Sequence, residues 1–144
     1  MRRLVVDVRP GEYTISRLPA DAPVPAGLLD LPGLVSVTRT PDELSIVCPS
    51  DHAPGVDTGA DTGTGTDTGI GATTQPGWRL LTVRGPLEFT LTGIMAALSG
   101  ELAAAGVSLF ALSTYDTDHL LVKATDLGRA VQALRDSGHE VTKP

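Results

Sequence analysis

The chain has 144 residues, enough for one compact domain or for two small ones that share a core. Hydrophobic residues make up 41% of the chain but aromatic residues only 3%, so we expect an aliphatic core. The net charge of −6 disfavours binding to nucleic acid or to an anionic membrane surface. No stretch approaches the roughly 18 apolar residues of a membrane span, and we therefore expect a cytoplasmic protein with neither kind of partner.

The N-terminal half, residues 1–49, contains several short apolar runs. We predict strands at "RRLVVDVRP" and "EYTISRLP", and a hairpin in which "LVSVTRT" and "ELSIVCP" are joined across Pro41 and Asp42. Between these strands, "AGLLDLPG" has room for at most about two helical turns. This half therefore resembles a small α+β module that lacks a clear second helix.

Residues 50–77 are rich in Gly, Thr and Asp and contain few large apolar side chains. Such a segment buries too little surface to offset the entropy of ordering it, so we predict a flexible insertion. The triplet Asp-Thr-Gly, found in the active sites of aspartic proteases, begins here at Asp57, Asp61 and Asp67. That chemistry needs two aspartates held rigidly together, whereas these lie among Gly and Thr, and a low-complexity linker is the better interpretation.

The C-terminal half, residues 78–144, has a clear alternation of elements. "WRLLTVRG" is a predicted strand, residues 93–105 have apolar side chains at helical spacing, and "VSLFALST" and "HLLVKA" are predicted strands. A second helix is predicted over residues 126–137, ended by Gly138 and followed by a short strand at "HEVTK". The order is that of a ferredoxin-like fold, in which two helices cover one face of an antiparallel sheet. The hairpins of the two halves resemble each other, so we predict two related modules in tandem, the first of them shortened.

The usual signatures of catalysis and metal binding are missing from the sequence. There is no G-x-S-x-G, no G-x-x-x-x-G-K-[ST] and no G-x-G-x-x-G. His52, His119 and His139 have no ligand spacing, and Cys48 lies in an apolar run that is typical of a buried structural thiol. We therefore expect no enzyme activity, no metal and no cofactor.

Two places remain as candidate binding sites. The first is the helix start in "FTLTGIMAAL", where Thr90 or Thr92 can cap the helix and free main-chain N–H groups near Gly93 can bind a carboxylate. The alternative is an ordinary capped helix in which Gly93 allows close packing.

The second place is "STYDTD", residues 113–118. Asp116 and Thr117 suit an ordinary turn, whereas Asp118 stands at the start of the next strand and can pair with an ammonium group. In this fold the loop after the first strand and the turn between the second and third strands need not adjoin within one module. The site can therefore form between modules.

The motifs that surround these places resemble a known family. "GPL" at residues 85–87, "TGI" at 92–94, "LSTYDTD" at 112–118 and "LLV" at 120–122 are similar to the ACT-domain family of small bacterial tandem-ACT proteins, whose module also occurs in the cytosolic arginine sensor of animal cells. The match covers most of the C-terminal half. In the N-terminal half it rests chiefly on "ELSIV", residues 43–47.

The resemblance implies a tandem ACT fold, a homodimer, and non-catalytic binding or sensing of a small ligand, usually an amino acid, at the interface between modules. The α-carboxylate of the ligand would bind near the helix start and Asp118 would hold its ammonium group. The alternative is a structural or regulatory protein–protein interaction module without a ligand. The sensor has an aromatic residue where this chain has Thr117, which argues against arginine itself. The resemblance assigns one wall of the site to Ser45, Ile46 and Val47, the helix start to Gly93 and Ile94, and the other wall to Thr114, Tyr115, Thr117 and Asp118.

Overall fold

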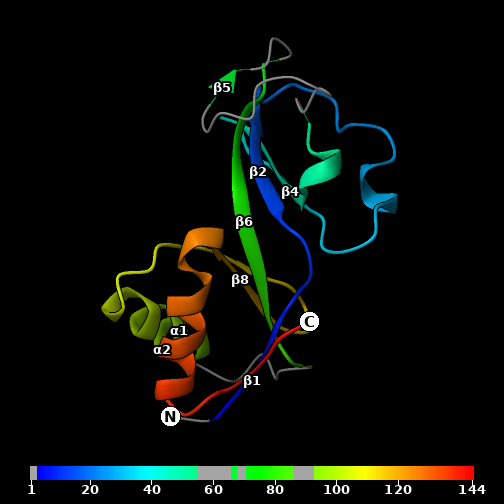
Figure 1. Ribbon diagram of the computed structural model, residues 1–144. Helices are drawn as coiled ribbons and strands as arrows, with labels where there is room; N and C mark the ends of the chain where they lie inside the picture. Colours follow the sequence, from blue (N-terminus) through cyan, green and yellow to red (C-terminus); the bar gives the residue numbers. More distant parts are fainter. Residues whose placement is uncertain (1–2, 55–65, 68–70, 86–92) are drawn as a thin grey trace. The chain divides into compact units, whose positions relative to one another are not determined.

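The computed structural model describes residues 3–54, 66–67, 71–85 and 93–144 of the chain. These form two compact units, one built from residues 11–78 and the other from residues 1–10 together with 79–144. The strand β6 (Thr73–Val83) begins in the first unit and ends in the second, and it is the long green strand of Figure 1.

The C-terminal unit has the strand and helix order that the sequence predicts. Its strands lie in the order β7-β8-β6-β1-β9, and β7 and β8 form an antiparallel hairpin. Two α-helices lie side by side and pack against one face of this sheet (Figure 1). The prediction of an α+β, ferredoxin-like fold is therefore confirmed. Besides β6, the elements of this order are α1 (Ile94–Ala104), β7 (Leu109–Ser113), β8 (Asp118–Lys123), α2 (Leu127–Asp136) and β9 (Glu140–Thr142).

The first strand, β1 (Val5–Val8), belongs to the C-terminal unit, whereas the sequence suggested a place in the N-terminal module. It is antiparallel to β6 and parallel to β9, and so it lies between the first and last strands of the ferredoxin-like order. Val6 and Val8 point toward the helices and are buried with Leu81. The alternating pattern identifies β1 as a strand but contains no information about which sheet it joins.

The core of the C-terminal unit is aliphatic, as the composition predicts. α1 contributes Leu98 and Leu102 at i and i+4, and α2 contributes Val131 and Leu134 at i and i+3, which are the spacings that place side chains on one face of a helix. The strand residues that complete this core include Val6, Val8, Leu81, Val83, Leu120, Val122 and Val141.

Both α-helices end in the same hydrogen-bond pattern. Past the end of α1 the N–H of Val107 donates to the carbonyl of Leu102 (3.0 Å), and past α2 the N–H of His139 donates to the carbonyl of Leu134 (3.1 Å). These are the six-to-one bonds of a Schellman motif. The predicted helix stops at Gly106 and Gly138 are therefore confirmed.

The described part of the N-terminal unit has the same strand order but contains no α-helix. Its strands pair in the order β3-β4-β2-β6. If the four strands are numbered along the chain, the order across the sheet is 2-3-1-4. The C-terminal unit has the same order when β1 is left out. In the described part of this unit, short 3-10 turns stand where α-helices would be expected. The elements are β2 (Tyr13–Leu18), η1 (Leu28–Asp30), β3 (Ser36–Arg39), β4 (Leu44–Pro49), η2 (Ser50–His52), β5 (Thr66–Asp67) and the first half of β6.

The end of the predicted insertion is ordered. β6 begins at Thr73 and pairs with β2 through residues that the sequence assigned to the segment 50–77. Ala72, just before it, is fully buried in the core of the N-terminal unit with Ile46 and Cys48. Thr and Gln can occupy strand positions when a neighbouring strand supplies the hydrogen bonds, which local composition does not reveal.

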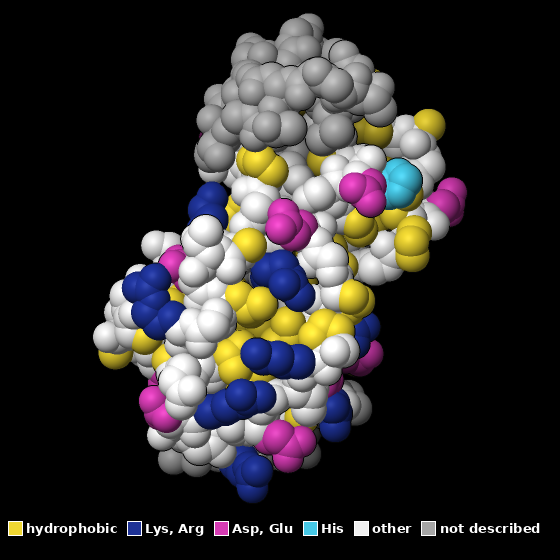
Figure 2. Space-filling view, viewed as in Figure 1, with side chains coloured by type: hydrophobic (Ala, Val, Ile, Leu, Met, Phe, Trp, Pro, Cys, Tyr) yellow, Lys and Arg dark blue, Asp and Glu magenta, His cyan; other side chains and the backbone are white. Residues whose placement is uncertain are grey.

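In the view of Figure 2, acidic side chains stand singly, whereas several Lys and Arg side chains lie near one another in the lower part of the picture. The net charge of −6 is therefore not gathered into an acidic patch on this face. None of the helices in the described ranges is long and apolar enough to cross a membrane.

Candidate functional site

The turn between β7 and β8 is held by its own main chain and by a threonine. The N–H and the hydroxyl of Thr114 both donate to the carbonyl of Thr117, at 2.8 and 3.1 Å. Tyr115, which is 80% exposed, and Asp116 form the tip. The turn assignment for Asp116 is therefore consistent with the structure.

Thr117 joins this turn to the end of β6. Its Oγ1 donates to the main-chain carbonyl of Val83 at 2.5 Å. The sequence suggested that the turn and the end of the first strand need not adjoin within one module. In the C-terminal unit they do adjoin, because β8 pairs with β6 and Thr117 lies directly before β8.

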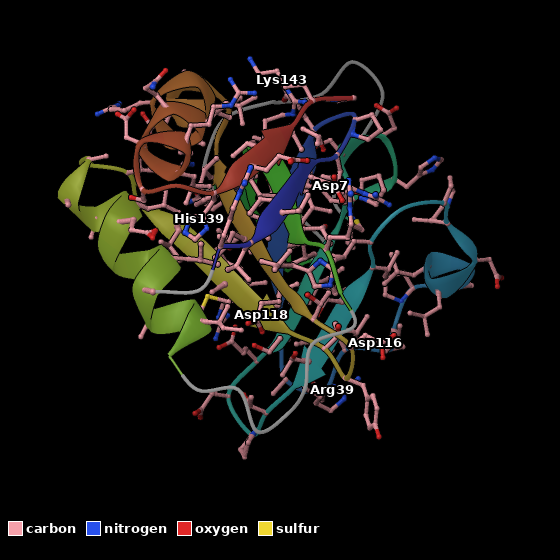
Figure 3. All side chains as sticks on the ribbon, turned by 90° about the horizontal axis from the view of Figure 1, so that it is seen from below. Asp7, Arg39, Asp116, Asp118, His139 and Lys143 are labelled. Atoms are coloured by element: carbon pink, nitrogen blue, oxygen red, sulfur yellow. The ribbon has the colours of Figure 1, made fainter. Side chains whose placement is uncertain are left out.

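Asp118 lies on the helix-covered face of the sheet. Side chains alternate along a strand, so Asp118 shares its face with Leu120, which is buried in the core that Ile94 of α1 also contacts. The carboxylate is half-buried and accepts a hydrogen bond from Oγ of Ser113 at 2.6 Å. In the projection of Figure 3, Asp118 lies between the first turn of α1 and Asp116.

The start of α1 has main-chain donors that no acceptor inside the helix satisfies. The first hydrogen bond within the helix runs from the N–H of Ala97 to the carbonyl of Gly93 (2.8 Å), so the N–H groups of Ile94, Met95 and Ala96 have no acceptor within the helix. No acidic side chain occupies the first turn. This end of the helix therefore has the donors and the partial positive charge that favour an anion.

Gly93 is the N-cap residue, with a φ of 80°. A Cβ at this position would have no atom within 4 Å, so close packing does not explain the glycine. The explanation is the left-handed backbone conformation, which L-residues with a side chain adopt at a cost. The proposed caps Thr90 and Thr92, together with residues 86–87 of the "GPL" motif, lie outside the described residues.

His119 lies on the opposite face of β8 from Asp118, and sequence reasoning gave it no role. Its Nδ1 is 3.1 Å from Oγ1 of Thr82 and its Nε2 is 3.5 Å from Oγ1 of Thr114. Burial lowers the pKa of His119, with Arg9 acting in the same direction and Asp118 against it. The imidazole is therefore neutral near pH 7 and acts as part of the polar network behind the turn.

The N-terminal unit contains a second hairpin with the same turn. The N–H of Thr40 donates to the carbonyl of Glu43 (2.9 Å), as Thr114 does to Thr117, and each turn is closed by one residue pair. In the C-terminal hairpin that pair is Ser113 and Asp118, whereas here it is Arg39 and Leu44.

Neither member of the Arg39 and Leu44 pair resembles its counterpart in chemistry. Leu44 is fully buried in the core, and the guanidinium of Arg39 donates to the main-chain carbonyls of Ala20 and Ala22. The carboxylate and the serine are therefore features of one hairpin only.

The residues assigned to the first wall, Ser45, Ile46 and Val47, follow one another along β4. Ile46 is fully buried in the core of the N-terminal unit, and the alternation of the strand places Ser45 and Val47 on its other face. Only Ser45 is appreciably accessible, since Val47 is 2% exposed. Their role in binding stays a prediction of the resemblance.

The remaining candidates do not form a reactive site. Cys48 is fully buried, and burial raises the pKa of its thiol to about 11, as expected for a structural cysteine. No cluster of three or more potential metal ligands occurs within the described ranges. Asp57 and Asp61 lie outside those ranges, whereas Asp67 belongs to β5.

Comparison with known proteins supplies the family context. A family model described as an ACT domain matches residues 73–136, and a model of an N-terminal domain matches residues 11–56. A protein from Agrobacterium tumefaciens with a known crystal structure is 35% identical in sequence to this chain. The two structures match with a TM-score of 0.82 over 100% of this chain and 96% of that one.

Two further similar proteins are much longer than this chain. The human "Cytosolic arginine sensor for mTORC1 subunit 1" is 39% identical over 59 residues, which are 40% of this chain and 18% of that protein. The match thus spans less than a fifth of the length of these curated relatives. The aspartate kinase from Synechocystis has a similar fold, with a TM-score of 0.64 at 17% identity over 99% of this chain and 28% of the kinase.

Proposed function

Because the chain belongs to the ACT-domain family, we propose that it is a non-catalytic regulatory protein that binds an amino acid at the C-terminal unit. One observation carries the proposal. The carboxylate of Asp118 and the first turn of α1 lie on the same face of one sheet, and Thr117, next to Asp118, is bonded to the end of β6, the strand that precedes α1.

This arrangement is complementary to a zwitterion. The N–H groups of Ile94, Met95 and Ala96, with the positive end of the helix, suit the α-carboxylate of a ligand. Asp118 suits the α-ammonium, because an ionised acceptor forms stronger and shorter hydrogen bonds with a charged donor. Two opposite charges on neighbouring groups of the ligand are matched by two opposite charges on the protein.

The comparison with the arginine sensor supports an amino acid as the class of ligand. The side chain of that ligand is a separate question. Thr117 has no aromatic ring, and its hydroxyl is already committed to the carbonyl of Val83. A long side chain therefore finds no stacking surface at this position, and we expect an amino acid other than arginine.

A thermal-melting screen with each proteinogenic L-amino acid at millimolar concentration tests the proposal. A ligand that binds only the native state raises the melting temperature by mass action, so one or a few amino acids should do so. Replacing Asp118 with Asn keeps the shape but removes the charge, and should weaken binding by about tenfold to a hundredfold. The N-acetyl derivative of a stabilising amino acid lacks the ammonium charge, and the methyl ester lacks the carboxylate charge. Neither derivative should raise the melting temperature.

The competing function is an interaction module without a ligand. It would be favoured if no amino acid shifted the melting temperature of the wild-type protein. An Asp118→Asn variant that binds as tightly as the wild type would refute the assigned site and not the function. A homodimer is expected from the resemblance alone, and light scattering of the purified protein measures it; the cytoplasmic location is an expectation from the sequence.

A further inference from the structure

Ser113 is bonded to the residue on which the proposed function depends. Its hydroxyl donates to Oδ1 of Asp118 at 2.6 Å across the last pair of the β7–β8 hairpin. The terminal torsion of an aspartate is soft, and a carboxylate without a fixed partner rotates broadly about it. A donor fixed on the neighbouring strand restrains that rotation and leaves Oδ2 for a ligand.

The bond is not required for the hairpin to form. The hairpin of the N-terminal unit has the same four-residue turn with the same threonine hydrogen bond, and it is closed by Arg39 and Leu44. The turn therefore does not require a serine and a carboxylate at these two positions. Ser113 is exposed, so its side chain adds little to the core.

We propose that Ser113 is a positioning residue, which holds the Asp118 carboxylate so that Oδ2 meets the ammonium group of the bound amino acid. This inference rests on the proposed function. In the N-terminal hairpin the equivalent positions contain no carboxylate, and the guanidinium of Arg39 is already bound to the carbonyls of Ala20 and Ala22. A single ligand therefore binds per chain, at the C-terminal hairpin.

A restrained carboxylate binds more tightly because less freedom is lost when the ligand arrives. The expected gain is modest, since Ser113 is exposed and Asp118 only half-buried. A hydrogen bond to a charged group in such a setting corresponds to a change of about threefold to tenfold in the dissociation constant.

The test uses the full chain and the same panel of proteinogenic L-amino acids, first by thermal melting and then by calorimetry with each amino acid that stabilises the wild type. Ser113→Ala should weaken binding by about threefold to tenfold with little change in the melting temperature of the free protein. Ser113→Thr keeps the hydroxyl and should restore binding. Ser108→Ala is the matched control, because Ser108 is an exposed serine directly before the other end of the same strand.

Each outcome decides a different point. Wild-type affinity in Ser113→Ala, or an equal loss in Ser113→Thr, would overturn the positioning role and leave the proposed function intact. Two ligands per chain in the calorimetric titration would overturn the restriction to one hairpin. If no amino acid bound the wild type, the proposed function would fail and this inference with it.

Discussion

The conformation of Gly93 leads to a prediction that needs no ligand. Gly93 has a φ of 80°, whereas Gly100 lies within α1, and a Cβ at either position would meet no atom within 4 Å. The Ala variants at these two positions therefore differ only in the backbone conformation that they require. Gly93→Ala forces a left-handed conformation on a residue with a side chain, at a cost of about 1–2 kcal/mol.

Gly100→Ala should have the opposite effect, because Ala in a helix interior is favoured over Gly by about 0.5–1 kcal/mol. Urea unfolding followed by far-UV circular dichroism measures both, since α1 and α2 belong to the C-terminal unit and dominate the helical signal. The midpoint should fall for Gly93→Ala and rise for Gly100→Ala. Equal stability of the two variants, or a gain from Gly93→Ala, would refute the assigned backbone conformation.

Two further predictions concern titratable side chains. Burial lowers the pKa of His119, so the unfolded chain binds more protons than the native protein below about pH 6.5, and stability is lost as the pH falls. Between about pH 7 and pH 5 the urea midpoint of the wild type should therefore fall more than that of His119→Gln, and parallel losses would contradict this role. Cys48 should resist alkylation in the native protein and react in denaturant, because it is fully buried and its pKa is raised to about 11. Intact mass measures the labelling, and rapid modification of the native protein would show that the thiol is accessible.

The C-terminal unit could be predicted from the sequence because local signals agree there. Leu98 and Leu102 share a helical face, Gly106 ends the helix, and the polar turn between "VSLFALST" and "HLLVKA" separates two apolar strands. Pattern, stop signal and turn chemistry all support the same elements, which is the condition under which sequence reasoning succeeds.

Long-range pairing was less predictable. β1 reads as a strand from its alternating valines, but its place between β6 and β9 depends on residues more than 70 positions away. β6 likewise begins in a segment of low hydrophobicity, because β2 provides its hydrogen-bond partners. Register and partner choice depend on the whole fold and leave little trace in a short window.

The candidate site was predicted in part. The face and position of Asp118 follow from its place at the start of a strand, whereas Ser113 could have been recognised only from its pairing with Asp118 across the hairpin. Ile46, which the resemblance assigns to a binding wall, is an inward-facing residue of an alternating strand, and its role in binding stays a prediction. That burial was accessible to sequence reasoning, because Leu44, Ile46 and Cys48 repeat with a period of two.

The most direct measurement is a titration of the isotope-labelled protein with the panel of L-amino acids, followed by the main-chain amide resonances. A bound amino acid should shift the amides of Ile94, Met95 and Ala96 at the start of α1 and of Asp118 at the start of β8, because these groups are proposed to contact it. At a ligand concentration near the dissociation constant of the wild type, the shifts should be much smaller in Asp118→Asn. A stabilising amino acid that leaves all four amides unchanged at saturation would contradict the proposed site.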